Sequence, residues 1–343
     1  FFAYVGLYVL LRYRFNSLLS FTGLIIFGSF SVIIVNLAKG LIDLPAMSFM
    51  IWVLIFSIAA IKENPKFYLI VFPLFAIGFF VKYIVGFILP IILLYYLMNK
   101  DLLSLTEDIV HDKVKFKQKI CAYLKSTEFK YILIGILLGF ILAIIICKTL
   151  ILDYGGSLTF FNQSMDTFNK LSQVNTPEAI NFNPDRSFYL DKLPVILYQR
   201  RDFYFELFCL VFGVFSIGCL LKAVNLIKNR SVLLDAVHQN NFFKNNLDKI
   251  FILIFILSIC GIFLGFVKYY NHMISNISLL IGIISLYLIL QRLKFNNENN
   301  VLFLLFLSYF MVNFIFISLF HIKVFRYILP IIPPVIYFII WGL

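Results

Sequence analysis

The stretch FYLIVFPLFAIGFFVKYIVGFILPIILLYYLM, residues 67–98, contains one charged side chain, Lys82. As a single helix it would be about 48 Å long, whereas the hydrocarbon core of a bilayer is about 30 Å thick. The segments KENPK before it and MNKD after it both have the basic character of cytoplasmic loops, so an even number of crossings is required. We therefore predict two short helices that meet near Lys82, because a lysine at mid-bilayer would cost about 2.5 to 3.5 kcal/mol.

The rest of the chain is equally apolar. Of its 343 residues, 62% are hydrophobic and 13% are charged. In soluble domains about half of the residues are hydrophobic and about 25% are charged. This composition excludes a soluble enzyme, a nucleic-acid-binding domain, a disordered tail and a disulfide-rich secreted module. The sequence predicts an all-α, polytopic integral membrane protein with a single transmembrane domain over residues 1–343.

Apolar runs of membrane-spanning character recur along the chain. We count ten, with a last partial run as the eleventh: 1–11, 18–37, 44–61, 67–80, 84–98, 131–152, 203–221, 250–267, 276–290, 301–320 and the run from 328. The first and last runs are expected to be truncated, since the chain begins with Phe and no cleavable signal precedes its first apolar run.

Basic residues indicate which side of the membrane each connection faces, because short cytoplasmic loops are enriched in Lys and Arg. Every other connection is basic: residues 12–14, 62–66, 100–130, 222–249 and 292–294. We therefore predict cytoplasmic loops at about 99–130 and 222–249, and a long outer loop at about 153–202. The prolines and aromatic residues of that outer loop predict short helices at the membrane surface.

Four local patterns occur in a distinctive order. They are NLAKGLIDLPAMSFMIWVLI at 36–55, FAIGFFVKYIVGFILPIILLYYL at 75–97, FYLDKLPVIL at 188–197 and HIKVFRYILPIIPPV at 321–335. Their order, spacing and predicted side of the membrane resemble the GT-C class of polyprenyl-phosphate-sugar-dependent glycosyltransferases. That class includes the protein O-mannosyltransferases and the lipid A aminoarabinose transferase. The resemblance covers nearly the whole chain.

The resemblance carries expectations for individual residues. It implies that the family's first span and first outer loop, with the principal acidic site, lie upstream of Phe1, so that the chain is N-terminally truncated. Asp43 in LIDLP takes the place of the family's second acidic residue. Lys82 takes the place of a lysine in the family's hairpin, and the pair Arg326 and Tyr327 takes the place of a late motif of the family. Together they imply an outward-facing cavity for a lipid-linked sugar donor.

Asp43 is the catalytic candidate. A carboxylate at the start of a span is stabilised by the free N–H groups and the dipole of the helix, so an N-cap, or an ion pair with Lys39, explains it as well as catalysis does. The functional hypothesis is that Asp43 orients the acceptor hydroxyl or holds a divalent metal, Mg or Mn, on the donor phosphate.

The substrate-binding candidates are cationic and aromatic. Lys82 at the hairpin apex, beside Tyr83, is either an interfacial lysine or the cation that neutralises the departing polyprenyl phosphate. Arg326 is the preferred phosphate contact. Arg186 and Tyr189 belong to a basic, aromatic end of the long loop, which fits a membrane interface as well as a substrate site. The candidates for substrate binding are therefore Lys82, Tyr83, Arg186, Tyr189, Arg326 and Tyr327.

These features favour a membrane glycosyltransferase, transferring a hexosyl or pentosyl group from a polyprenyl (dolichyl-type) phosphate to an acceptor glycan, lipid or protein. The expected location is the cell membrane, multi-pass, with the active site facing outside, and the expected surroundings are the lipid bilayer without nucleic acid. A polysaccharide polymerase or a lipid-linked-oligosaccharide flippase stays open as the alternative. A transporter would show ionisable residues at mid-membrane, whereas here they gather at one face.

Overall fold

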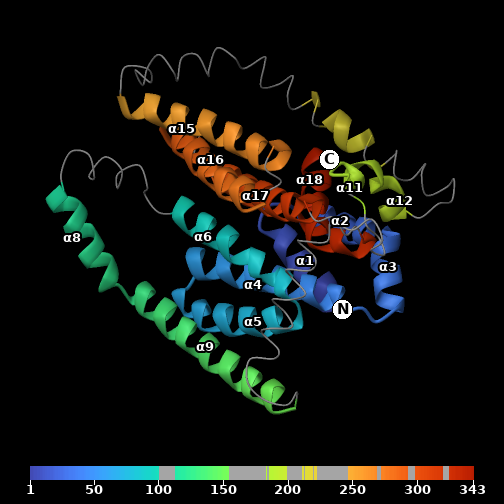
Figure 1. The fold of residues 1–343 in the computed structure, drawn as a ribbon, viewed down its shortest axis with the longest axis horizontal. Coiled ribbons are helices and arrows are strands. Elements are labelled where there is room, and N and C mark those ends of the chain that lie inside the picture. Colours follow the sequence, from blue (N-terminus) through green and yellow to red (C-terminus); the bar gives the residue numbers. More distant parts are fainter. Residues whose placement is uncertain are drawn as a thin grey trace.

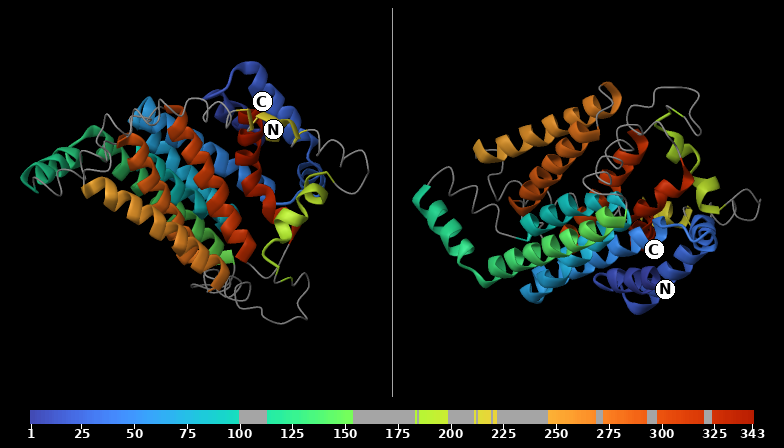
Figure 2. Two further views of the ribbon diagram at one scale, coloured as in Figure 1. Left: turned by 90° about the horizontal axis from the view of Figure 1, so that it is seen from above. Right: turned by 60° about the horizontal axis from the view of Figure 1, so that its bottom comes forward.

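The computed structural model describes residues 1–99, 113–153, 183, 185–198, 211, 213–218, 220–221, 246–268, 272–292, 298–319 and 324–343. Within these ranges the regular secondary structure is entirely helical, as the sequence predicts for an all-α protein (Figure 1). The helices lie side by side as a bundle (Figures 1 and 2). Most of the predicted cytoplasmic loop at 222–249 and most of the predicted outer loop lie outside the described residues, and residues 246–249 belong to a helix that begins at Asn246.

Six helical segments of the described chain are long and apolar enough to cross a membrane. They lie in α4 (Asp43–Lys62), α9 (Thr127–Asp153), α15 (Asn246–Phe263), α16 (His272–Arg292), α17 (Glu298–Leu319) and the joined pair η4 (Phe325–Ile331) and α18 (Ile332–Gly342). A bent pair makes a seventh if it is counted as one span. The described residues thus support a polytopic membrane protein but not the predicted total of ten to eleven spans. About half of the run at 203–221 lies outside them.

The predicted span at 18–37 is not one straight helix. It consists of α2 (Ser17–Ser29) and α3 (Ser31–Ala38), which are bent by 63°. Phe30 between them has extended backbone, and its ring is fully buried against Tyr198 at 5.4 Å between ring centroids. Gly and Ser neighbours favour helix kinks, and a tertiary contact with Phe30 fixes this one.

The predicted pair of short helices around Lys82 is confirmed. The short 3₁₀ turn η1 (Pro65–Phe67) leads into α5 (Tyr68–Val81), which ends at Lys82, and η2 (Tyr83–Phe87) leads into α6 (Ile88–Met98). Each piece is shorter than a full span. The two helices flank α4 (Figure 1), so the chain reaches the apex and returns.

Burial separates central helices from peripheral ones. The spans of α4 and α17 are 61% and 72% buried within the protein, whereas that of α9 is only 11% buried. Helix α1 (Phe2–Arg12) packs on α4 and α2, and the C-terminal α18 packs on α2 and α17. The core therefore surrounds α4 and α17, and most of the apolar surface of α9 lies outside this core.

Polar contacts tie several helices together at the basic ends. Lys62 at the end of α4 pairs with Glu298 at the start of α17, at 2.9 Å between Nζ and Oε2. Arg14, after α1, donates to the carbonyl oxygen of Asn299 at 3.0 Å and to the hydroxyl of Tyr337. The predicted cytoplasmic residues Arg14 and Lys62 thus meet at one end of the bundle, about 30 Å along α4 from Asp43.

Three smaller helices of the described residues lie in segments that the sequence predicts as loops. Helix α8 (Lys113–Leu124) lies in the predicted cytoplasmic loop at 99–130 and extends away from the bundle (Figure 1). Helices α11 (Phe188–Asp191) and α12 (Leu193–Tyr198) lie near the end of the predicted outer loop. The expectation of short helices in that loop is met in its described part.

Helix α9 attaches to the bundle mainly through α5, by way of two glycines. A methyl group at Gly135 would lie 2.3 Å from the carbonyl oxygen of Tyr68, and one at Gly139 would lie 2.9 Å from the backbone of Phe72. Small residues four apart allow such close helix contact in membranes. The spacing GILLG therefore decides where α9 docks.

We expect Gly135→Leu to separate α9 from α5 and to lower the thermal midpoint of the detergent-purified protein by several degrees, because overpacking costs about 1 to 3 kcal/mol. Gly213→Leu is the matched control, since a methyl group there would meet nothing within 4 Å. Fluorescence-detected size exclusion after heating measures both variants. Equal midpoints for the two would show that the Gly135 contact is dispensable.

Candidate active site

A helix-terminating turn places Asp43. Gly40, in the left-handed conformation at φ +60°, ends α3. The N–H of Gly40 donates to Leu37 O and that of Leu41 to Asn36 O, both at 3.1 Å, which is the Schellman pattern. The chain then reverses into α4, where Asp43 is the first helical residue and Ile42 the N-cap. The carboxylate of Asp43 therefore lies at the positive end of the α4 dipole.

Lys82 meets Asp43 from the end of α5. Its backbone is extended, with φ −162° and ψ 128°, so the helix ends there and the side chain turns toward α4. The ammonium group forms an ion pair and hydrogen bond with Oδ1 of Asp43. The side chain of Lys82 is 11% exposed and that of Asp43 5%. Asp43 therefore pairs with Lys82 rather than with Lys39, and both roles predicted for Lys82 stay predictions.

Arg326 and Tyr327 approach from η4. The Nε atom of Arg326 lies 3.8 Å from Oδ2 of Asp43. The ring of Tyr327 carries both cations, with Nζ of Lys82 at 5.1 Å and the guanidinium carbon of Arg326 at 5.9 Å from the centroid. Cations within about 6 Å of an aromatic ring are attracted by its quadrupole. Three distant segments thus form one cluster, which we call the Asp43 cluster: Asp43, Lys82, Arg326 and Tyr327.

The Asp43 cluster has unused hydrogen-bonding capacity and surplus positive charge. Two cations face one carboxylate, which leaves one net positive charge. Among the described residues, Oδ2 of Asp43 and Nε of Arg326 have no hydrogen-bond partner, and their 3.8 Å separation is too long for a hydrogen bond. The Arg326 side chain is 40% exposed. Its guanidinium group is therefore accessible to an anion such as a phosphate.

The remaining predicted residues lie around this cluster or elsewhere. Tyr83 lies within electrostatic range of Asp43 and Tyr327. Arg186 is bound to another part of the protein, since its Nη1 donates to the carbonyl oxygen of Phe266 at 2.6 Å. Phe266 belongs to η3 (Leu264–Lys268), a π-helical turn that follows α15. A substrate role for Arg186 stays a prediction of the sequence.

Tyr189 holds the backbone that carries Arg326. Its hydroxyl donates to the carbonyl oxygen of Val324 at 3.1 Å and accepts from the N–H of Val324 at 3.2 Å. Phe188 stacks on Phe325 at 6.0 Å between ring centroids. Burial raises the pKa of Tyr189, so its hydroxyl stays protonated and available to donate. Tyr189 is thus placed to position η4 from α11.

We expect Tyr189→Phe to lower the stability of the protein by about 1 to 2 kcal/mol, because two backbone groups of Val324 lose their partner. If the hydroxyl positions Arg326, KM for a phosphate-bearing donor rises as well. Tyr198→Phe is the control, since that hydroxyl contacts Ser29 on α2 at 3.1 Å. The same KM in both variants would leave Tyr189 with a structural role only.

The sequence also suggests a divalent metal at Asp43, and the surrounding residues do not fit one. Two cations already occupy the space around the carboxylate, and the described part of the chain holds no group of three or more His, Cys, Asp or Glu side chains suited to a metal. Hard cations need several oxygen ligands. Metal binding at Asp43 stays a prediction, and the mechanism proposed below requires none.

The sequence interpretation missed two contacts of the candidate site. It gives Asp43 and Lys82 separate roles, whereas they form one buried ion pair. It gives Tyr189 to the substrate, whereas the hydroxyl binds the backbone of Val324. Opposite charges at span ends on the same predicted face were the available signal for the first contact. The sequence carries no local signal for the second.

Comparisons with known proteins bear on the first third of the chain. Residues 1–111 match the family model described as dolichyl-phosphate-mannose-protein mannosyltransferase. This range contains Asp43 and Lys82 but neither Tyr189 nor Arg326. Searches of curated proteins and of solved structures found no match. The GT-C resemblance is thus confirmed, because residues 1–111 are similar to this family of membrane glycosyltransferases.

Proposed function

We propose that the protein is a glycosyltransferase that moves a sugar from a polyprenyl-phosphate carrier to an acceptor at the outer face of the cell membrane. The observation that carries the proposal is the convergence of Asp43, Lys82 and Arg326 from α4, α5 and η4. A buried carboxylate flanked by two cations, one of them partly exposed, suits a phosphate monoanion at the end of a lipid. The family match over residues 1–111 supports the same class of reaction.

The chemistry is a displacement at the anomeric carbon of the donor sugar. An oxygen of the acceptor hydroxyl forms the new bond to this carbon, the bond to the phosphate oxygen breaks, and its electron pair stays with the phosphate. Lys82 and Arg326 lie where that negative charge develops, and pre-positioned cations at such a point supply several kcal/mol. The polyprenyl phosphate leaves with one more negative charge than the donor carried.

Asp43 is better suited to positioning than to taking the acceptor's proton. Both oxygens of its carboxylate already face a cation, Oδ1 that of Lys82 and Oδ2 that of Arg326. Its contacts instead hold Lys82 and Arg326 close to the ring of Tyr327. The acceptor's proton therefore passes to a base other than Asp43, while Asp43 keeps Lys82 and Arg326 in place.

The outer face is proposed from the distribution of charge. Asp43 is at the opposite end of α4 from Lys62, and Arg14 and Glu298 gather at the Lys62 end. Because basic residues of short loops mark the cytoplasmic side, the Asp43 cluster faces outward. A lipid-linked donor, inserted by its chain, presents its phosphate and sugar at that level.

Arg326→Gln tests the proposal in a transfer assay with the full-length protein and labelled polyprenyl-phosphate sugars. Hydrogen bonds to charged groups contribute about 1.5 to 3 kcal/mol, so kcat/KM should fall about 10- to 100-fold. Arg326→Lys should recover part of the lost kcat/KM, since lysine keeps the positive charge but lacks the planar guanidinium group that binds a phosphate through two N–H donors. Arg12→Gln, an exposed arginine at the opposite end of the bundle, is the control.

Two results would count against the proposal. The first is an absence of transfer from every polyprenyl-phosphate sugar by a well-folded full-length protein. The second is transfer by Arg326→Gln at the same rate and KM as the unchanged protein, which would leave Arg326 without a role in binding phosphate.

A further inference from the structure

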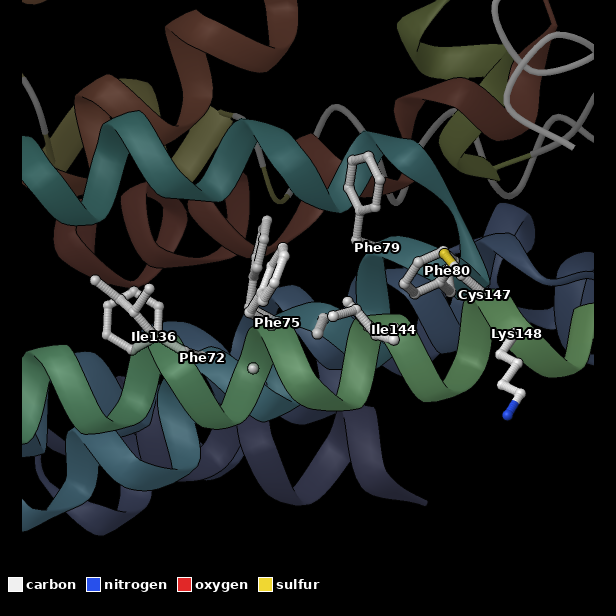
Figure 3. A pocket seen from close by; sticks show the side chains of 12 residues that line it. Phe72, Phe75, Phe79, Phe80, Ile136, Ile144, Cys147 and Lys148 are labelled. Atoms are coloured by element: carbon white, nitrogen blue, oxygen red, sulfur yellow. The ribbon is translucent and has the colours of Figure 1, made fainter. Parts of the chain in front are cut away.

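An apolar groove lies between α5 and α9, on the outside of the bundle. Its volume is about 780 Å³, within the range of about 300 to 1,000 Å³ typical of ligand sites. Phe72, Phe75, Phe79 and Phe80 line it on the α5 side, and Figure 3 shows the rings of Phe72, Phe75 and Phe80 near α9. The lining is almost wholly apolar, so the occupant is a hydrocarbon chain rather than a sugar.

The groove results from small residues on α9. Gly139, Ala143 and Cys147 line it at intervals of four residues, which places them on one face of the helix. The backbones touch where Gly139 meets Phe72. Beyond that point, Ala143 and Cys147 leave space that larger side chains would fill. The cavity is therefore a consequence of the same sequence that docks the helix.

A lysine stands at one end of this groove. Lys148 lines the groove next to Cys147 and is exposed, and Figure 3 shows its ammonium group directed away from the apolar lining. Gly135 lies beside Tyr68 and Gly139 beside Phe72, so α5 and α9 run in the same direction. Lys148 consequently lies near the level at which α5 ends. An apolar channel with a cation at one end matches an amphiphile with an anionic head.

The groove and the Asp43 cluster lie on different faces of α5. Gly78 packs against Phe49 of α4, and Lys82 turns toward Asp43 of the same helix. The phenylalanines of the groove face α9 instead. An anionic head on a chain in this groove therefore meets Lys148, whereas Lys82 is directed toward α4. The occupant is thus distinct from a donor bound at the Asp43 cluster.

We propose that this groove binds one acyl chain of an anionic phospholipid from the surrounding bilayer, with the lipid phosphate paired to Lys148. The bilayer has direct access, because the span of α9 is only 11% buried. Basic residues beside grooves between membrane helices recognise lipid head groups. The bound chain fills the space between α5 and α9 and so supports the end of α5 that carries Lys82.

The test measures retained lipid and stability in nanodiscs made from equal parts phosphatidylglycerol and phosphatidylcholine with identical chains. After transfer to detergent, the full chain should retain phosphatidylglycerol in excess. Lys148→Gln should reduce that excess about fivefold, the factor expected of one lysine near an anionic surface. Lys130→Gln, an exposed lysine at the other end of α9, should change it little.

A second pair of variants tests the groove itself. Ala143→Trp fills the groove and should abolish retention of phosphatidylglycerol and the rise in thermal midpoint that the lipid gives. Leu137→Trp places the same ring on the bilayer-facing side of α9, where Leu137 is 57% exposed, and should leave both unchanged. If Ala143→Trp fails to fold, Lys148→Gln still decides the question.

Three results would overturn this proposal. One is equal retention of the two lipids by the unchanged protein. Another is retention of phosphatidylglycerol by Lys148→Gln at the unchanged level. The third is displacement of the retained phosphatidylglycerol from the unchanged protein by an equimolar amount of polyprenyl phosphate, which would assign the groove to the donor's chain.

Discussion

Asp43→Asn is expected to reduce sugar transfer about 100-fold, and to do so through kcat. The amide keeps the shape of the side chain but removes the negative charge that holds Lys82 and Arg326 together. Two neighbouring cations then repel each other across a site that is only 5% exposed at Asp43. Loss of one pre-positioned electrostatic group costs about 2.7 to 4 kcal/mol of transition-state stabilisation.

The same substitution should also destabilise the protein. Removal of one partner from a buried ion pair costs about 3 to 5 kcal/mol, because the other charge is left buried. Initial rates and the thermal midpoint must therefore be measured on the same preparations. Glu63→Gln, an exposed carboxylate beyond the other end of α4, is the control. Full activity of Asp43→Asn at unchanged stability would remove Asp43 from the site.

Lys82→Met is expected to have the second large effect, a fall in kcat of about 100-fold with a smaller change in KM. Methionine fills a similar volume without a charge, so the departing phosphate loses a cation where its negative charge develops. Asp43 keeps Arg326 as its remaining partner, at 3.8 Å. Lys39→Met, an exposed lysine in the turn before α4, is the matched control.

The double variant Asp43→Asn with Lys82→Met separates stability from chemistry. With both members of the buried pair removed, neither Asp43 nor Lys82 is left buried without the other, so the double variant should be more stable than either single one. Activity should nevertheless stay low, because the cation needed by the leaving group is still missing. Recovery of activity together with stability would mean that the pair is structural only, and that the phosphate is bound elsewhere.

Arg326 is the second cation of the Asp43 cluster, and it lies outside the family match, which ends at residue 111. The C-terminal segment supplies Arg326 and Tyr327, and α11 holds that segment through Tyr189. The site therefore depends on parts of the chain far from the matched range. A fragment limited to residues 1–111 would contain Asp43 and Lys82 without the second cation.

Local sequence determined much of the architecture. The length of each apolar run, and the position of the charges between runs, predicted α4, α9, α16 and α17 to within a few residues. It also predicted the interruption at Lys82, because a lysine in the middle of an apolar stretch has to reach a polar end. These features depend on transfer from water to lipid, which each segment undergoes largely on its own.

Only the tertiary structure decided which residues contact one another. The 63° bend at Phe30 depends on a ring in α12, and the Asp43–Lys82 pair joins residues 39 positions apart. Two charges can pair only if their helices pack in one particular arrangement. The preference of each apolar helix for lipid does not depend on which helices lie beside it, so it does not determine that arrangement. For that reason the sequence named the charged residues of the site, whereas only the fold showed which of them meet and that Arg186 binds the backbone of Phe266.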